Sequence, residues 1–531
     1  MKHLVAPAIL LSLAIAGIGC SPVRDPLTCS AKGGPVWRRL STKHFVLHTD
    51  LEAQYARTMA ADFIRMYETL AFVMQRPPNT PAIPVEIVVF ERRSDFYEVE
   101  GMNRSSGAYF TPWLKGDLEP TPVVVMHDEV LREEVRDTFQ HEIAHRFLHE
   151  RFVRLPPWLD EGLAQYYATM HVEEGRAYIG APGFLDFSDR PFFWISWNGN
   201  SQTTQIPMFK APSVRALIEA DRSTFYGNYE QEDVSEEERE RRTIYYGAAW
   251  KLVHFFLNGP DDLYRNRFLE FLREVQSGTG AREAFLKAFE RDLPQIEQGF
   301  YRYLANARLD RLVVSVPPSR EAAPLEERVF DEAEAHILWA RLLPRTNQKE
   351  HTERVSRHLE EAVAENPKSP EVRFHRGVFY AQEKQFDKSV AELDIALGAR
   401  PDDPRYLLAR INLYELQAKE NKTAPDAAPV PADIIERLAR VAVSPAQLMA
   451  VGFLTANQGR INEGLQLIER AVAVDPLCWR CQTARAVVLA RVERYQEALE
   501  AVDRAIAITP EKAPVTELVR LRDKIAKKKT R

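Results

Sequence analysis

A periodic spacing of prolines in the C-terminal part constrains the fold of this 531-residue chain more than any other feature. Pro367 and Pro401 are 34 residues apart, and so are Pro476 and Pro510. The interval from Pro401 to Pro476 is 75 residues, which is two periods plus seven, and the polar stretch 419–432 can hold the extra residues. This period predicts repeated helical hairpins, each ended by a proline, that bury their apolar faces against their neighbours.

Small and aromatic residues recur at matching places when the chain is aligned on these prolines. They are Trp339, Ala362, Gly377, Tyr380, Ala396, Gly452, Ala471, Ala498 and Ala505. The pattern resembles the tetratricopeptide repeat, in which small residues let the two helices of a hairpin approach closely. The resemblance implies an all-α tetratricopeptide-repeat solenoid over residues 329–531 that binds a protein partner.

The N-terminal 20 residues have the composition of a secretory signal. A short polar start is followed by apolar residues 4–18, a run too short to span a membrane, and then by Gly19 and Cys20. This ending resembles a bacterial lipobox, in which the cysteine is lipidated, although Gly17 departs from the usual pattern. The resemblance implies a lipid anchor at Cys20 on the periplasmic or outer face of a bacterial membrane, with Ser21 favouring the outer membrane in a Gram-negative host. Ordinary signal cleavage that leaves Cys20 unmodified is the alternative.

Composition limits the other classes of function. The chain has 70 basic and 76 acidic residues and a net charge of −6, so it lacks the basic surface that nucleic-acid binding requires. The four cysteines are too few for a disulfide framework. Cys478 and Cys481 form a CxxC motif, for which a structural bridge or packed thiols are favoured over a redox role.

Apolar runs of strand length precede the helices in the N-terminal half. The runs at 45–48, 85–90, 108–110 and 123–126 predict strands, and a helical period covers residues 51–74. After the last of these strands the period is helical over most of the chain. A small mixed sheet followed by helices predicts an α+β catalytic unit.

The motif His141-Glu142-Ile143-Ala144-His145 lies within one of the expected helices. Positions i and i+4 share one helix face, so both imidazoles can reach one metal ion, and Glu142 can take a proton from a metal-bound water. Glu161 follows sixteen residues after His145, near the start of the next helix. Since a hydrolytic zinc site uses three protein ligands and one open position, His141, His145 and Glu161 are the predicted ligands.

The HExxH motif followed by the PxWLxEGxAxY segment at 156–166 resembles the peptidase-MA-like gluzincins, relatives of thermolysin and the aminopeptidases. The resemblance covers about residues 36–306 and includes a downstream helix that carries Tyr245 and Tyr246. It implies Zn²⁺ ligation by His141, His145 and Glu161, proton transfer by Glu142, and oxyanion stabilisation by Tyr246 or, alternatively, by Tyr245.

Three residues or segments near the motif have expected supporting roles. Asp160 either orients a ligand or caps its helix. Asp137 lies one turn before His141 and can accept its free imidazole N–H, although an exposed helix carboxylate is an equal alternative. The strand at 108–110 is followed by Pro112, which suits a sheet edge able to pair with an extended substrate.

The sequence therefore predicts a secreted, lipid-anchored zinc metallopeptidase that hydrolyses peptide bonds, with repeats that recruit its substrate or partner. Its expected parts are a signal peptide (1–20), a tether (21–35), a zinc metallopeptidase domain (36–306), a linker between independently packed units (307–328) and the repeat domain (329–531). The alternative is an inactive peptidase-like repeat scaffold for protein–protein interaction. A zinc hydrolase that does not act on peptides would use the same ligands.

Overall fold

The computed structural model describes most of the chain between Leu27 and Lys529. The described residues are 27–76, 84–100, 108–111, 123–128, 132–152, 155–180, 192–195, 204–207, 211–226, 236–259, 262–277, 279–289, 292–304, 310–317, 325–343, 348–421, 430–476, 478–508 and 515–529. The predicted signal peptide, the lipidation residue Cys20 and residues 21–26 of the tether lie outside them. Among the described helices, none combines the length and the apolar character that a membrane span requires.

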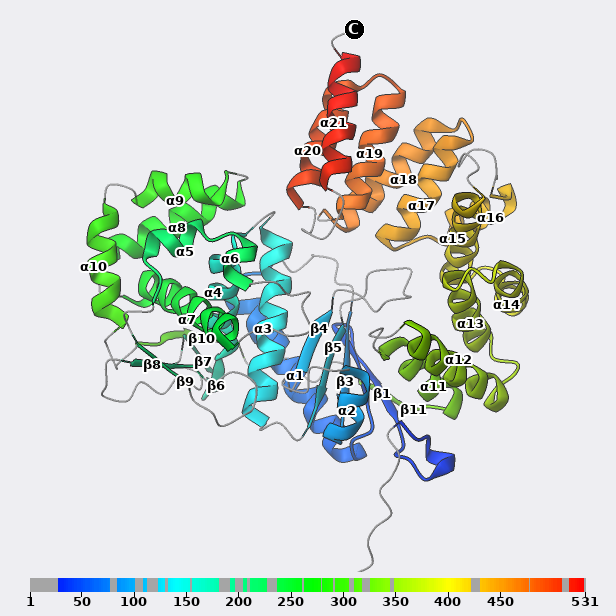
Figure 1. Cartoon of the computed structure of the whole chain (residues 1–531), viewed down its shortest axis with the longest axis horizontal. Coiled ribbons are helices and arrows are strands. Elements are labelled where there is room, and N and C mark those ends of the chain that lie inside the picture. Colours follow the sequence, from blue (N-terminus) through cyan, green and yellow to red (C-terminus); the bar gives the residue numbers. More distant parts are fainter. Residues whose placement is uncertain are drawn as a thin grey trace, which may run out of the picture.

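A six-stranded mixed sheet forms the centre of the N-terminal half (Figure 1). The strand order is β11-β1-β2-β3-β5-β4, in which β2, β3 and β5 run parallel. The strands are β1 (Arg38–Ser41), β2 (Phe45–Thr49), β3 (Val85–Phe90), β4 (Ala108–Thr111), β5 (Val123–His127) and β11 (Glu326–Val329). All six residues of β3 are buried, as expected for a parallel strand covered on both faces. The four strands that the sequence predicts are β2, β3, β4 and β5, and β4 lies at an edge.

Helices α1 (Ala53–Val73) and α3 (Arg132–Arg151) cover one face of this sheet. Alternate strand residues point to it, as the period of two requires. These residues are Phe45, Leu47, Ile87, Val89, Val124 and Met126. Phe63 of α1 stacks on Phe139 of α3 with ring centroids 4.4 Å apart. The helix that carries the HExxH motif is therefore fixed by packing against both the sheet and α1.

Further helices and two small sheets complete the N-terminal domain. The helices are α2 (Arg93–Glu100), α4 (Pro157–Ala168), α5 (Val214–Glu219), α6 (Arg222–Tyr226), α7 (Glu236–Asn258), α8 (Asp262–Gln276), α9 (Ala281–Phe289) and α10 (Leu293–Leu304). The small sheets are β10-β7-β6, from β6 (His171–Glu173), β7 (Arg176–Ile179) and β10 (Leu312–Ser315), and β8-β9, from β8 (Phe192–Ile195) and β9 (Thr204–Pro207). Stacked rings such as Phe256 and Phe268, 4.9 Å apart, hold α7 against α8.

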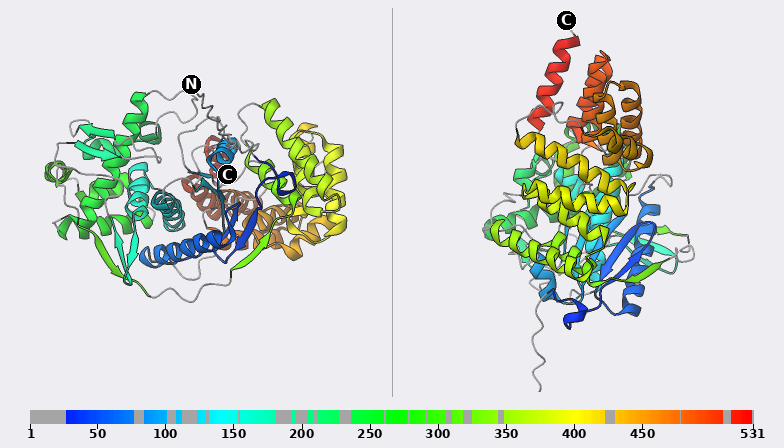
Figure 2. Two further views of the ribbon diagram at one scale, coloured as in Figure 1. Left: turned by 90° about the horizontal axis from the view of Figure 1, so that it is seen from below. Right: turned by 90° about the vertical axis from the view of Figure 1, so that its right-hand side faces the viewer.

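Successive helical hairpins follow along a curved path in the C-terminal part (Figures 1 and 2). Their helices are α11 (Glu332–Leu342), α12 (Gln348–Glu365), α13 (Pro370–Gln382), α14 (Phe386–Ala399), α15 (Pro404–Glu420), α16 (Ala432–Val441), α17 (Pro445–Asn457), α18 (Ile461–Val474), α19 (Trp479–Arg491), α20 (Tyr495–Ile508) and α21 (Val515–Lys529). A Cβ at Gly377 would lie 2.8 Å from Leu393, and one at Gly452 would lie 2.7 Å from the Gly464 carbonyl oxygen. The predicted small positions are thus close helix contacts. The predicted 34-residue units correspond to these hairpins, with the longer stretch between α15 and α16.

The CxxC motif forms a disulfide at the start of α19. Cys478 and Cys481 are bonded, and Cys478 also caps the helix, because its sulfur accepts a hydrogen bond from the backbone N–H of Cys481. Of the alternatives that the sequence left open, this arrangement is the structural bridge.

Residues 307–328, predicted to form a linker, contribute strands to two sheets instead. β10 pairs with β7, and β11 pairs with β1 at the edge of the main sheet. The prolines of this segment predict a linker, but Pro317 comes after the end of β10 and does not interrupt it. β10 and β11 satisfy their backbone hydrogen-bonding groups by pairing with strands of the N-terminal domain. The described parts of this segment, β10 and β11, are therefore held against the N-terminal domain.

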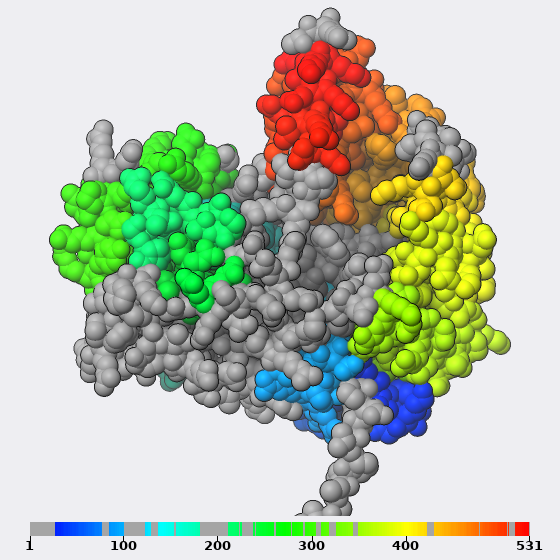
Figure 3. All heavy atoms as spheres, viewed as in Figure 1, coloured from blue at the N-terminus to red at the C-terminus, as the bar shows by residue number. Residues whose placement is uncertain are grey.

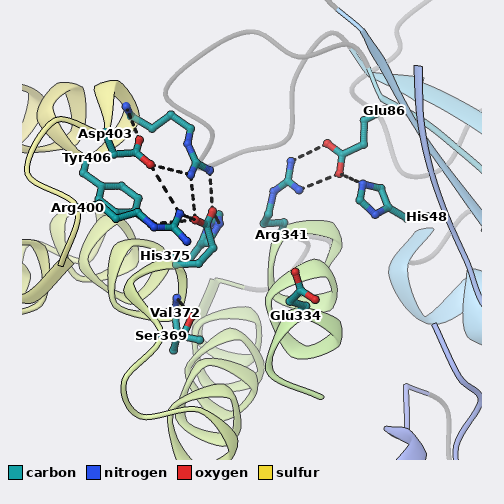
Figure 4. Close-up of polar contacts among 12 residues, drawn as sticks. His48, Glu86, Glu334, Arg341, Ser369, Val372, His375, Arg400, Asp403 and Tyr406 are labelled. Carbon is teal, nitrogen blue, oxygen red and sulfur yellow. Dashed lines mark hydrogen bonds and ion pairs between the residues drawn. The ribbon is translucent and has the colours of Figure 1, made fainter. Parts of the chain in front are cut away.

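The first repeat hairpin covers the second face of the main sheet. Trp339 of α11 packs edge-on against Trp37, which packs edge-on against Phe90 of β3, with centroids 6.4 and 5.2 Å apart. Arg341 of α11 also donates two hydrogen bonds, of 2.9 and 2.8 Å, to the Glu86 carboxylate of β3 (Figure 4). The sheet and α11–α12 share one hydrophobic core. The two predicted modules are therefore not packed independently.

The second half of the predicted tether belongs to the same core. Leu27 and Cys29 are buried in it, and the backbone N–H of Ala31 donates a 3.0 Å hydrogen bond to Glu332 of α11. In the space-filling view, this N-terminal segment (dark blue) lies directly against the first hairpin (green) (Figure 3). The tether prediction 21–35 is wrong from residue 27 onward, because apolar side chains in this stretch find a surface to bury against.

Candidate metal centre

The three predicted zinc ligands converge where α3 packs against α4. His141 and His145 lie one turn apart on α3, with their Nε2 atoms 3.0 Å from each other. Glu161 is on the first turns of α4, and its Oε2 lies 3.4 Å from His141 Nε2 and 3.5 Å from His145 Nε2. All three side chains are mostly buried, with exposed fractions of 9–14%. The structure thus brings together residues that are up to twenty positions apart in sequence.

The spacing of these donor atoms fits a tetrahedral zinc site. Zinc bonds to nitrogen and oxygen are about 2.0–2.2 Å, so neighbouring ligand atoms in a tetrahedral site lie roughly 3.3–3.6 Å apart. The two separations from Glu161 Oε2, 3.4 and 3.5 Å, lie in this range, and the 3.0 Å between the two imidazole nitrogens is slightly shorter than it. Two imidazoles and one carboxylate are also the donor set of many hydrolytic zinc sites, and they leave a fourth position open. The residues present therefore fit the metal that the sequence implies.

Asp160 holds His145 in the orientation that a metal ligand needs. Its Oδ1 lies 2.8 Å from His145 Nδ1, so the ring donates from Nδ1 and directs the Nε2 lone pair toward His141 and Glu161. Its Oδ2 lies 2.9 Å from Nε2 of His149, a half-exposed residue at the next turn of α3. Of the two roles expected for Asp160, the structure supports orientation of a ligand.

Charge and burial oppose each other in this cluster. Burial by itself lowers the pKa of His145, but the neighbouring carboxylates Asp160 and Glu161 outweigh it and raise that pKa well above 6.5. Burial by itself raises the pKa of Glu161, but the two imidazoles outweigh the effect of burial and lower that pKa to about 2. For Glu142 the burial dominates and raises the pKa. The ligands are thus an anionic carboxylate and a basic imidazole, while Glu142 has a higher proton affinity than an exposed glutamate.

Gly162 lets α7 approach Glu161. A Cβ at this glycine would lie 2.7 Å from the Ala249 carbonyl oxygen and 2.7 Å from a Val253 methyl group, both on α7. This close contact brings the buried Tyr246 of α7 to the metal-ligand cluster, where its hydroxyl donates a 3.3 Å hydrogen bond to Glu161 Oε1. Of the two candidate tyrosines, Tyr246 is therefore the one beside the ligands.

Some predicted neighbours of the site are not joined to it. Within the described part of the chain, His141 Nδ1 has no hydrogen-bond partner, so Asp137 does not orient this ligand as predicted. The pairing of His149 with Asp160 was not predicted, since it depends on the angle between α3 and α4 rather than on any local spacing.

Comparisons with known proteins match the repeats. Residues 350–411 and 456–513 each match a family model described as tetratricopeptide repeat. The C-terminal part therefore carries tetratricopeptide repeats, as the sequence predicts, and no comparison supports the gluzincin resemblance. No curated protein matches the chain.

Several solved structures are similar to part of this chain at low identity. PilW, a type IV pilus biogenesis factor, is 15% identical, with a TM-score of 0.30, over 37% of this chain and 84% of that one. YrrB, described as a TPR protein with an unusual peptide-binding site, is 19% identical, with a TM-score of 0.26, over 36% and 93%. PilF of Pseudomonas aeruginosa is 15% identical, with a TM-score of 0.28, over 38% and 86%. With TM-scores this low, these likenesses carry no argument about function.

Proposed function

We propose that this chain is a zinc-dependent peptidase of the gluzincin type, whose tetratricopeptide repeats hold a protein substrate or partner. The observation that carries the proposal is the convergence of His141, His145 and Glu161 at tetrahedral spacing, with Glu142 on the same helix. A structural zinc site would use four protein ligands, whereas the described part of the chain offers three here, with Glu142 next to His141 in sequence. That combination supports hydrolysis rather than a purely structural metal.

The residues around the centre divide the chemistry among them. His141, His145 and Glu161 would hold Zn²⁺, which would supply a Lewis acid and a bound water of lowered pKa. Glu142 accepts the proton of the attacking water and returns it to the leaving amine, and its raised pKa suits both transfers. Tyr246 is buried beside Glu161, and its hydroxyl is the donor for the oxyanion that develops on the scissile carbonyl.

The edge strand β4 supports a peptide as the substrate class. Ala108–Thr111 pairs with β5 on one side and is the last strand of the sheet order. An extended peptide can add to such an edge through its main chain. Because backbone pairing is largely independent of side chains, β4 gives no preference for particular residues in the substrate.

A repeat scaffold without activity is the second candidate. The observation that favours it is that the family models match only the repeats. Against it stand the convergence of the three candidate ligands and the presence of Glu142 on the same helix as His141 and His145. A scaffold would bind its partner equally well after Glu142 is replaced, and it would hydrolyse no peptide.

Zinc binding to the ligand set is the direct test of the site. Glu161→Gln replaces a charged ligand by a neutral amide of the same shape. It should weaken zinc binding by more than the roughly 10- to 100-fold that loss of a supporting residue costs. Glu173→Gln, at an exposed position of β6, is the control and should bind zinc like the wild type. Equal affinity in both variants would remove Glu161 from the ligand set.

The lipid anchor at Cys20 and a place in the cell envelope belong to the same proposal. They rest on the resemblance to a lipobox, since Cys20 lies outside the described residues. Cys20→Ser should move the protein from the membrane fraction to the soluble fraction of the envelope. Retention of this variant on membranes would assign the attachment to another surface.

A further inference from the structure

A second group of metal-ligand side chains lies within the first repeat hairpin. His336 is on α11, and His358 and Glu361 are three residues apart on the facing surface of α12. One donor atom from each of the three residues lies within 4.8 Å of the other two. The hairpin covers the face of the sheet opposite α3, so this group is separate from the HExxH centre.

The imidazole rings of His336 and His358 face each other through their Nδ1 atoms. His336 Nδ1 and His358 Nδ1 are 3.0 Å apart, which equals the separation between the two histidine nitrogens of the HExxH centre. His336 is buried, with an exposed fraction of 2%. Burial lowers the pKa of both imidazoles.

Glu361 supplies the negative charge that a divalent cation needs. Its Oε2 lies 3.1 Å from His336 Nε2 and 3.1 Å from the ammonium of Lys32. The Lys32 side chain is 53% exposed and the Glu361 side chain is 34% exposed, so both have room to rotate. A turn of the Glu361 carboxylate from Lys32 toward the two Nδ1 atoms completes a set of two nitrogens and one oxygen. Metal sites in helical bundles use a glutamate and a histidine three residues apart on one helix, in the order Glu-x-x-His, together with ligands from a facing helix. His358 and Glu361 have the same separation in the reverse order.

We propose that His336, His358 and Glu361 form a second site for a first-row divalent metal ion of the zinc type. Imidazole and carboxylate donors together suit Zn²⁺, Ni²⁺ and Cu²⁺ better than Mg²⁺ or Ca²⁺. The ion joins α11 to α12 beside Trp339, whose ring lies 5.5 Å from that of His358. It therefore stiffens the hairpin that attaches the repeats to the sheet.

Metal stoichiometry in the full chain tests this site. The protein is stripped with a chelator and titrated with Zn²⁺ against a chromophoric competitor at pH 7.5, with Co²⁺ absorption as a second readout. The wild type should bind two equivalents, and His358→Gln and Glu361→Gln should each lose one. His375→Gln, which removes a histidine from the next hairpin, is the matched control and should keep both. Circular dichroism melts verify that each variant is folded. If His358→Gln does not fold, the result for Glu361→Gln, at a more exposed position, decides whether the site exists.

The possible outcomes distinguish the second site from the HExxH centre. Loss of one equivalent in His358→Gln and Glu361→Gln supports the second site, whether the wild type binds two equivalents or only one. If these folded variants bind as many equivalents as the wild type with unchanged affinity, the second site does not exist and the ring nitrogens share only a proton. If Glu161→Gln loses no equivalent, the failure lies in the HExxH centre instead.

Discussion

Replacing Arg341 by Met should destabilise the sheet and the first repeat hairpin together. The substitution keeps most of the apolar stem but leaves the Glu86 carboxylate without its bidentate partner. The Glu86 side chain is only 9% exposed, and its remaining neighbour is His48, 3.1 Å away. Removing one partner of a buried ion pair lowers the free energy of unfolding by about 3–5 kcal/mol, because the charge of the other partner stays buried without compensation. We expect a loss of that size in the free energy of unfolding.

A surface pair inside the repeats provides the matched control. Arg485 of α19 contacts Glu469 of α18 at 2.8 Å, with exposed fractions of 25% and 42%. Such pairs contribute at most about 1 kcal/mol, because water screens them. Arg485→Met removes the same type of side chain from a contact between two helices. It should therefore lower the free energy of unfolding far less than Arg341→Met does.

Hydrogen exchange measured element by element is the appropriate assay. If the sheet and the hairpin share one core, amides of β3 and α11 should lose protection together in Arg341→Met. Loss of protection in α11 with β3 unchanged would refute the shared core.

The stabilisation by the Glu86–Arg341 pair also depends on pH. Burial raises the pKa of Glu86, but Arg341 and His48 outweigh it and hold that pKa well below 4.5. The stabilisation is present at neutral pH and is lost as the pH falls below 4.5 toward the folded-state value.

Three further perturbations test the packing around the centre and the boundary between the two parts. Gly162→Ala should cost about 1–3 kcal/mol in urea unfolding and weaken zinc binding, because the new methyl group overlaps the Ala249 carbonyl on α7; unchanged zinc affinity would contradict this packing. Asp160→Asn should stay folded and lower zinc affinity by roughly 10- to 100-fold in a competition titration, since the His145 ring loses its anionic partner; wild-type affinity would show that Asp160 does not orient a metal ligand. Ending the chain at residue 323 should give aggregated protein in gel filtration, because β11 and the cover of the second sheet face are removed; a soluble monomer would restore the separable domain.

The sequence was sufficient where the determining interactions are local. The HExxH spacing on one helix and the apolar runs of the strands follow from periods of 3.6 and 2. The repeat period of 34 likewise reflects a unit that packs on its immediate neighbour. Glu161 could be predicted to lie beside His141 and His145 because its helix follows α3 after a short connection, and the structure brings the three side chains together.

The remaining features depend on partners far away in the sequence. β11 has no strong apolar pattern, and it forms a strand because β1, almost 290 residues earlier, offers an edge. Trp339 was recognised as a repeat position, yet its contact with Trp37 required knowing which hairpin lies on the sheet. The Glu86–Arg341 pair is likewise invisible to any local rule, because its members are 255 residues apart.

Turnover of a peptide library by the zinc-loaded full chain, compared with zinc-loaded Glu142→Gln, tests the proposed activity most directly. The amide keeps the shape of Glu142 but cannot accept a proton, and general acid–base groups contribute about 10² to 10⁴ in rate. We expect the wild type to cleave internal or terminal peptide bonds, and Glu142→Gln to keep its zinc while losing activity by that factor. Near-wild-type turnover by the variant, or no cleavage by a wild type shown to hold zinc at His141, His145 and Glu161, would contradict the assignment as a peptidase.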